Sequence, residues 1–221
     1  VFFTFRVLDF PDLTVDGSFP MGAVIMAACL HKGMHPLTGL LLSFGGGLAA
    51  GFVTAAIHNK LKVPHLLAGI LTMTMLYSVN IRVLSNRANL PLIRVDTILS
   101  RVHNATAGIM APEYATLLFF ILVVLAIKLA LDLFFITDMG LVFGALGNNE
   151  QMVRVQGINP ATLKLIGVGL SNGLVALSGA FAAQYQGFAD VNLGQGIVVM
   201  GLASVMLGEF LLKSNRIWIL T

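Results

Sequence analysis

Six apolar stretches divide the chain and constrain its fold more than any other feature. They cover residues 19–30, 36–57, 63–84, 114–136, 161–185 and 193–212. The hydrocarbon core of a bilayer is about 30 Å thick and a helix rises about 1.5 Å per residue, so one crossing needs about 20 mostly apolar residues. The first stretch is short for a full crossing, whereas the other five reach or approach that length.

No alternation of apolar and polar residues competes with the helical pattern. Strands exposed to lipid would leave backbone groups unpaired unless they closed into a barrel. We therefore predict an all-α, polytopic integral membrane protein with about six complete transmembrane helices. Apolar residues begin at Val1 and return at 218–221, so we also expect truncated helices at both ends.

The composition agrees with this class. Hydrophobic residues make up 57% of the 221 positions and charged residues only 10%, whereas soluble domains carry about 25% charged residues. Lipid must therefore cover much of the surface. The net charge of +3 is scattered, and no basic cluster predicts a nucleic-acid partner. We expect one transmembrane domain over residues 1–221, with no soluble domain.

Neither catalysis nor metal binding is indicated by the sequence. Cys29 is the only cysteine, so an internal disulfide or a cysteine metal cluster cannot form. His31 and His35 are four residues apart, but Pro36 follows at once and no carboxylate is near. The P-loop phosphate motif is missing, so the chain is not by itself a P-loop ATPase. We predict that it is not an enzyme and holds no metal or cofactor.

Polar side chains interrupt the stretches 63–84 and 161–185. In a membrane such side chains either bond to neighbouring helices or line a polar conduit, and the sequence leaves both roles open. Five of them are possible pathway-lining residues: Thr72, Thr74, Asn80, Ser171 and Asn172.

Pairs of glycines four residues apart occur within two of the apolar stretches. Gly47 pairs with Gly51, and Gly169 pairs with Gly173. Such pairs let helix backbones approach closely. Close packing within one subunit is favoured over a dedicated dimer seam, because glycine is common in membrane helices.

A polar segment over residues 137–160 carries strong local signals. Asn149 can cap a short helix that runs through Val155, with Glu150 in its first turn, where the helix dipole favours an acid. Gly157 can end this helix in a left-handed conformation, and Pro160 can start the next one. We expect an apolar side that a soluble partner could grip, formed by Met152, Val153 and Val155.

The same segment contains three motifs in order: Thr137-Asp138-Met139-Gly140, then Ala145-Leu146-Gly147-Asn148-Asn149-Glu150, then Gly157-Ile158-Asn159. This series resembles the cytoplasmic coupling loop of ABC importer permeases of the branched-chain amino acid and ribose type. The similarity continues through residues 164–179 and 199–209. The opening run 8–19 resembles a subgroup paired with binding proteins for tryptophan or other amino acids.

This resemblance implies a permease of the bacterial plasma (inner) membrane. It would form a homodimer, rest its coupling loop on a separate cytoplasmic ABC ATPase, and receive a small solute from an extracytoplasmic binding protein. The solute would be an amino acid, and the ATP would be bound by the partner. Glu150 and Arg154 are the expected polar contacts within the coupling set, which is Gly144, Ala145, Gly147, Asn148, Asn149, Glu150, Arg154, Gly157, Ile158 and Asn159.

A cytoplasmic coupling loop fixes the sidedness of the other connections by alternation. It places the basic segments 58–62 and 213–216 in the cytoplasm, as the positive-inside rule prefers. It also places 85–113 outside, against that rule, and the arginines there would then face the binding protein.

The main rival function is an ATP-independent secondary transporter or channel. That class needs an ionisable residue with a pathway role near the membrane centre. Lys128 and Asp132 are the candidates that the sequence offers for it. Their i,i+4 spacing near the Ile136 end of the stretch favours a structural pair over an ion relay.

Overall fold

The computed structural model describes residues 2–8, 10–93, 95–107 and 111–212, without the side chains of residues 209, 211 and 212. The predicted apolar segment at 218–221 lies outside this part of the chain. Within it, four helices are long and apolar enough to cross a membrane: α2 (Pro36–Leu61), α3 (His65–Val83), α5 (Pro112–Ile136) and α8 (Pro160–Gln186). The prediction of an all-α polytopic membrane protein is confirmed.

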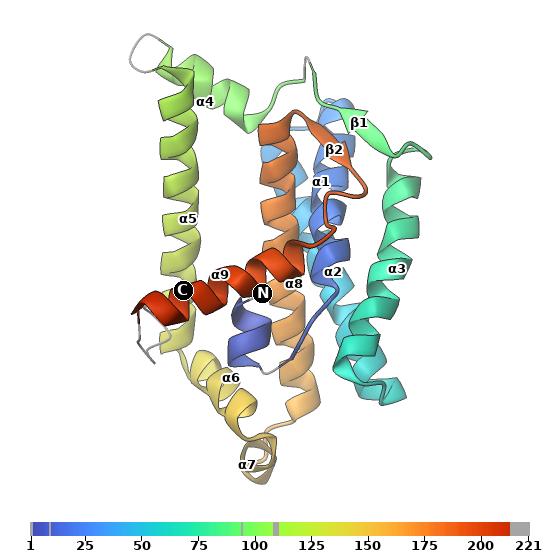
Figure 1. Ribbon diagram of the computed structural model, residues 1–221, viewed down its shortest axis with the longest axis vertical. Helices are drawn as coiled ribbons and strands as arrows, with labels where there is room; N and C mark the ends of the chain where they lie inside the picture. Colours follow the sequence, from blue (N-terminus) through green and yellow to red (C-terminus); the bar gives the residue numbers. More distant parts are fainter. Residues whose placement is uncertain (1, 9, 94, 108–110, 213–221) are drawn as a thin grey trace.

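Two shorter apolar helices complete the predicted set. Helix α1 (Val15–His31) runs beside α2 and α8, whereas α9 (Ile197–Leu212) runs across the bundle instead of along it (Figure 1). Thus the stretch 193–212 does not extend parallel to the other helices, because residues 193–196 form a turn that redirects the chain.

Short elements close the two ends of the bundle. Strand β1 (Asn89–Pro91) pairs antiparallel with β2 (Phe188–Asp190) at the end that also carries α4 (Ile98–Thr106) (Figure 1). The opposite end carries α6 (Asp138–Asn148) and α7 (Glu150–Val155). A short π-helix, η1 (Phe3–Val7), precedes α1 and packs near α6 and α8.

Small residues bring α2 and α8 into backbone contact. A methyl group added at Gly47 would collide with the backbone oxygen of Asn172, and one at Gly51 would collide with that of Val168. Because lipid provides no hydrophobic drive between helices, such close packing is a main source of their association. The interpretation of the first glycine pair as packing within one subunit is confirmed.

The second glycine pair serves the same interface from the other side. The ring of Phe52 lies against Gly169, and the ring of Phe44 lies against Gly173. Helix α1 approaches α8 just as closely, since a methyl group at Gly179 would collide with the backbone oxygen of Phe19. Helices α1, α2 and α8 therefore form the tightly packed centre of the molecule.

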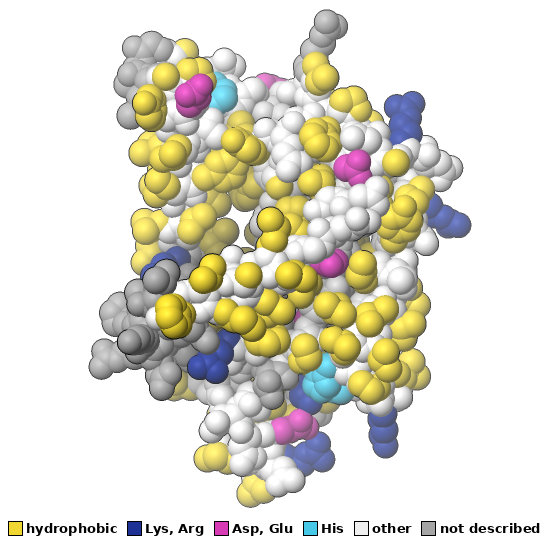
Figure 2. Space-filling view, in the orientation of Figure 1, with side chains coloured by type: hydrophobic (Ala, Val, Ile, Leu, Met, Phe, Trp, Pro, Cys, Tyr) yellow, Lys and Arg dark blue, Asp and Glu magenta, His cyan; other side chains and the backbone are white. Residues whose placement is uncertain are grey.

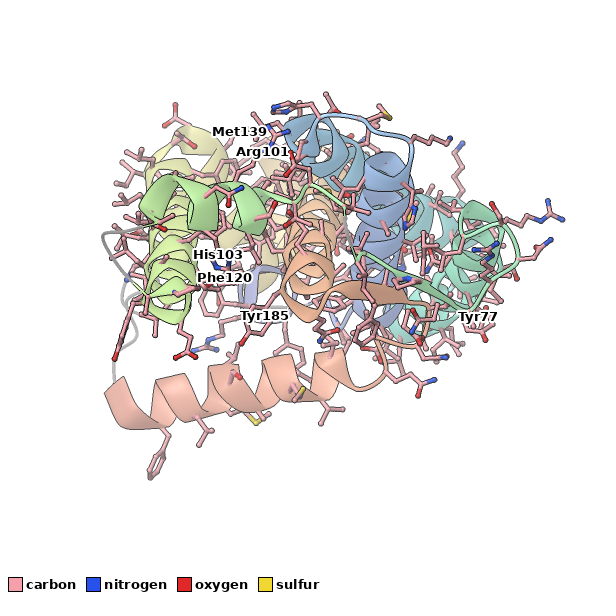
Figure 3. All side chains as sticks on the ribbon, turned by 90° about the horizontal axis from the view of Figure 1, so that it is seen from above. Tyr77, Arg101, His103, Phe120, Met139 and Tyr185 are labelled. Atoms are coloured by element: carbon pink, nitrogen blue, oxygen red, sulfur yellow. The ribbon has the colours of Figure 1, made fainter. Side chains whose placement is uncertain are left out.

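Helix α5 stands apart from this centre. None of the residues in its most apolar stretch is buried against the described part of the chain. It meets α8 through aromatic rings near one end, where the ring centroids of Phe120 and Tyr185 lie 5.7 Å apart, and these side chains are labelled in Figure 3. Near its other end, Phe134 and Phe135 pack against Phe3 of η1. The outward side of α5 between these contacts is left for lipid or protein to cover.

The close α2–α8 contact makes a specific stability prediction. We expect Gly47→Ala to lower the free energy of unfolding by about 1–3 kcal/mol, because the added methyl group overpacks a backbone contact. Gly45→Ala is the matched control: Gly45 has open space around it, and alanine there should be neutral or stabilising by up to about 1 kcal/mol. Thermal unfolding in detergent compares the two, and equal stability of both variants would contradict the packing account.

Candidate functional site

The coupling segment, residues 137–160, folds into α6 and α7 at one end of the bundle (Figure 1). The Asn149 side chain accepts a hydrogen bond from the Met152 backbone N–H at 3.1 Å and so caps α7. Gly157 has φ +84°, in the left-handed region, and Pro160 is the first residue of α8. These local predictions are confirmed, and α6 adds a helix that the sequence reading treated as loop.

Apolar side chains fasten the coupling segment to the bundle. Phe143, Leu146 and Val153 are almost fully buried in one core cluster with Phe3 of η1 and Leu163 of α8. The backbones of α6 and η1 also touch, since a methyl group at Gly147 would collide with the backbone oxygen of residue 7. These contacts tie α6 and α7 to η1 and to the start of α8.

The outer face of α7 presents apolar side chains to the surroundings. Met152 is 56% exposed and Val155 88% exposed, whereas Val153 is 1% exposed. The prediction of one apolar side through all three is wrong, because successive helical residues point about 100° apart. Val153 faces the bundle, and the other two face outward beside the exposed Arg154.

Glu150 bonds within the chain. Lys164 Nζ donates to one of its carboxylate oxygens at 2.8 Å, and Arg154 Nη2 donates to the other at 3.4 Å. The hydrogen bond from Lys164 is the main cause that holds the pKa of Glu150 below its ordinary value. Since the Lys164 side chain is only 12% exposed, this pair ties α7 to α8.

The remaining predicted coupling residues divide by exposure. Four of these positions are half-buried and four are exposed. The half-buried residues are Gly144, Ala145, Gly147 and Ile158, and the exposed residues are Asn148, Asn149, Gly157 and Asn159.

A buried polar network joins the start of α1 to α2 and α8. Asn172 Nδ2 donates to an Asp12 oxygen at 2.6 Å, and Ser18 Oγ donates to Asn172 Oδ1 at 2.7 Å. The hydroxyls of Thr14 and Thr54 bond to each other at 2.7 Å. All five side chains are at most 6% exposed, so the network stabilises the packing and leaves Asn172 fully engaged.

The five possible pathway residues lie in four different places. Thr74 and Asn80 line a cavity between α1 and α3 that has both polar and apolar walls, here named the Asp16 pocket. Ser171 faces the groove between α8 and α5, while Asn172 belongs to the buried network. Thr72 is 1% exposed and donates to a carbonyl of its own helix at 3.0 Å.

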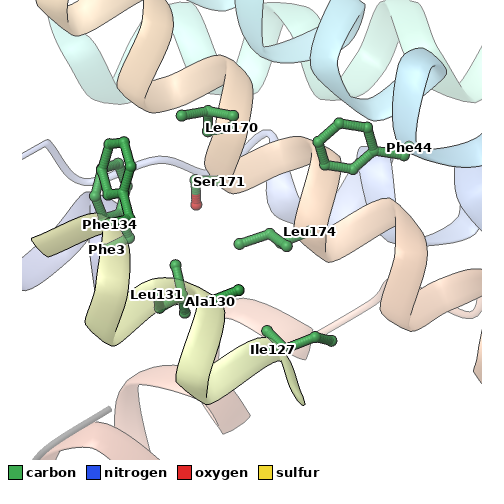
Figure 4. Close-up of a pocket in the computed structure, with 9 residues that line it drawn as sticks. All are labelled: Phe3, Phe44, Ile127, Ala130, Leu131, Phe134, Leu170, Ser171 and Leu174. Carbon is green, nitrogen blue, oxygen red and sulfur yellow. The ribbon is translucent and has the colours of Figure 1, made fainter. Parts of the chain in front are cut away.

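The groove between α5 and α8 differs in character from the Asp16 pocket. A cavity of about 200 Å³ in this groove is lined by apolar side chains from η1, α2, α5 and α8, and Figure 4 shows Ser171 as its one labelled polar side chain. Such a surface suits lipid chains or an apolar helix better than a polar solute.

Sequence reasoning missed Asp12 and Asp16 as site residues. Both lie in the run 8–19, which was read only as a subgroup marker. A usable signal was present, because carboxylates next to an apolar helix are expensive in a membrane and mark functional or structural sites.

The family model described as the permease component of branched-chain amino acid transport systems matches residues 1–214. The chain belongs to this family. Its members are transport permeases, and the family is that of ABC importers, which work with ATPase and binding-protein partners. The chain is a multi-pass membrane protein of this class.

Individual relatives agree with the family match. A tyrosine transport system permease protein of Clostridioides difficile is 41% identical over 96% of this chain and 68% of its own length. An uncharacterised protein of Rickettsia prowazekii is 31% identical over 97% of this chain and 72% of its own length. The autoinducer 2 import system permease protein LsrC of Photorhabdus luminescens is 25% identical over 89% of this chain and 57% of its own length. No solved structure gives a significant match.

The Glu150–Lys164 pair predicts a pH-dependent attachment of α7 in this permease. We expect Glu150→Gln to speed amide hydrogen exchange over residues 150–155 at neutral pH, because it removes the charge that Lys164 and Arg154 contact. The lowered pKa of Glu150 means that its contribution is present above the ordinary carboxyl pKa and is lost as the pH falls through the lowered one. The difference between variant and parent should therefore shrink in acid.

Glu113→Gln is the matched control for this measurement, since Glu113 lies in the first turn of α5 at the opposite end of the bundle. It should leave exchange in α7 unchanged. Equal exchange in the parent and the Glu150 variant at neutral pH would show that the pair does not hold α7.

Proposed function

We propose that this chain is the membrane-spanning subunit of an ATP-driven importer in a bacterial inner membrane. It forms, as a homodimer, the pathway for a small solute, and its coupling segment rests on a separate cytoplasmic ATPase. An extracytoplasmic binding protein delivers the solute. The observation that carries the proposal is α7, which projects from one end with Met152 and Val155 exposed and with its inner face locked to the bundle.

The exposed face of α7 suits a groove on a soluble partner. Two apolar side chains beside a cation give an anchor that a hydrophobic groove can bury, and contacts of this kind dominate interface energetics. Arg154 adds a charge at the edge of this face. Glu150 supports the same contact indirectly, because it holds α7 in place through Lys164.

The fold also supplies a route for movement from α7 into the bundle. The core cluster that buries Val153 of α7 also includes Phe3 and Val7 of η1. The chain continues from η1 through Asp12 and Thr14 into α1. One short segment thus contacts the coupling helices at one end and the Asp16 pocket at the other. A displacement of α7 would be transmitted along it by packed side chains and hydrogen bonds.

Two observations favour an amino acid as the solute. The C. difficile relative is named for tyrosine transport, and the family is described by branched-chain amino acids.

The ATP-independent alternative rested on Lys128 and Asp132, which are half-buried on α5. Figure 1 places α5 on the far side of α8 from α3, and the requirement of uptake for ATP separates the two functions.

The proposal predicts that Val155→Glu weakens binding of the ATPase at least tenfold, because a buried apolar contact becomes an unpaired charge. The measurement is co-purification of the ATPase with the full-length permease, together with ATP-dependent uptake of tyrosine into proteoliposomes that contain the ATPase and the binding protein. Both readouts should fall together.

Leu61→Glu provides the control for the same chemical change, since Leu61 is 70% exposed at the end of α2. It should retain ATPase binding. Full uptake without ATP or without the ATPase would overturn the proposal, as would unchanged ATPase binding by the Val155 variant.

A further inference from the structure

The Asp16 pocket is a cavity of about 180 Å³ between α1, α3 and the turn 191–196 that leads into α9, and it combines apolar walls with polar side chains. A single ordered water needs only about 10–15 Å³, so the volume of the cavity is several times that of a site for one structural water. Its polar lining comes from all three elements: Asp16, Thr74, Tyr77, Asn80, Asn192 and Gln195.

The pocket lies near the middle of the bundle in depth. Ser18, two residues after Asp16, donates a hydrogen bond to Asn172 at 2.7 Å, and Asn172 lies close to the midpoint of the 27-residue α8. The carboxylate of Asp16 is therefore about as far from one end of α8 as from the other. In a membrane-spanning subunit this is the depth at which a charge is most costly.

The surroundings of Asp16 do not suit contact with lipid. The turn 191–196 is irregular backbone, which at membrane depth is tolerated only where it is buried in protein or lines a water-filled cavity. Tyr77 is 48% exposed, and Asn192 and Gln195 are also exposed on this face. Figure 2 shows mainly non-hydrophobic atoms between α3 and the start of α9. The irregular backbone and the exposed polar side chains of this face suit contact with water or solute better than contact with lipid.

Two side chains of the pocket, Asn80 and Asp16, offer hydrogen-bond acceptors. Asn80 is fully buried and donates through Nδ2 to the backbone oxygen of Gly17 at 3.3 Å. Its Oδ1 accepts no hydrogen bond from the described residues, and a buried acceptor left in this state is destabilising. Asn80 is one of the residues that line the cavity, so a donor bound there would lie next to its side chain.

Asp16 adds the negative charge. Its two oxygens accept from the backbone N–H groups of Val198 at 2.9 Å and Gly196 at 3.4 Å, at the start of α9. Each carboxylate oxygen can accept a further hydrogen bond. The Tyr77 ring at the same cavity offers a face that attracts cations.

We propose that the Asp16 pocket binds the primary ammonium group of the solute on its way through the membrane. An ammonium carries three donors and one positive charge, which match the Asp16 carboxylate, the unmet Asn80 oxygen and the Tyr77 side chain. The ligand class is a small organic primary amine, and the solute itself is an amino acid that presents its α-ammonium. The latter identification rests on the proposed function.

The test measures equilibrium binding to the full-length permease in lipid nanodiscs, without ATPase or binding protein. Three probes share a phenyl ring: phenethylamine has only the ammonium, 3-phenylpropanoate has only the carboxylate, and phenylalanine has both. We expect the two amines to bind and the carboxylate probe to bind at least tenfold more weakly. Equal binding of all three would overturn the proposal.

Two variants locate the binding. Asp16→Asn keeps an oxygen that can cap α9, since asparagine caps helices about as well as aspartate, but removes the charge. Asn80→Leu removes the unmet acceptor at similar size. Each should weaken phenethylamine binding about tenfold or more. Asp96→Asn, at the exposed Asp96–Arg101 pair, is the charge-matched control and should bind like the parent.

The remaining outcomes also decide the question. Displacement of phenethylamine by sodium but not by choline would assign the pocket to inorganic cations and overturn the proposal. Unchanged amine binding by a folded Asp16→Asn variant would do the same. Because no ATPase takes part, amine binding at Asp16 can hold even if coupling through α7 fails, so this test and that of the proposed function have separate outcomes.

Discussion

The bilayer requires every buried polar group to find a partner, and the rest of this structure depends on how the start of α1 meets that requirement. Residues 10–14 carry irregular backbone and the carboxylate of Asp12 close to the bundle centre. Asn172 donates to that carboxylate at 2.6 Å and accepts from Ser18 at 2.7 Å. One asparagine on α8 thus provides the partner that the buried Asp12 carboxylate needs at this depth.

This segment connects the coupling helices with the Asp16 pocket. At one end, η1 shares a core cluster with Phe143 and Val153 of the coupling helices. At the other end, Asp16 caps α9 and lines the polar pocket beside Asn80. The glycine contacts among α1, α2 and α8 hold the centre firmly enough for small movements to be transmitted, because packed interfaces shift between discrete arrangements instead of deforming smoothly.

The sequence predicted those features that depend on local rules. Apolar length located the helices, and the Asn149 cap, Gly157 and Pro160 followed from short-range geometry. The sequence could not predict contacts between distant residues. The Lys164 partner of Glu150 lies 14 residues away, and the Asn172 partner of Asp12 lies 160 residues away. The outward direction of Met152 and Val155 also depended on which face of α7 meets the bundle. The course of α9 across the bundle has no signal in its apolar composition.

The central claim is that α7 lies on the cytoplasmic side and is covered by an ATPase. Gln151, exposed on α7, can be replaced by cysteine in a Cys29→Ala background and exposed to a membrane-impermeant maleimide. A cytoplasmic α7 covered by the ATPase predicts labelling in inside-out vesicles, protection when the ATPase is bound, and no labelling from outside intact cells. Labelling of Gln151→Cys from outside intact cells would contradict it.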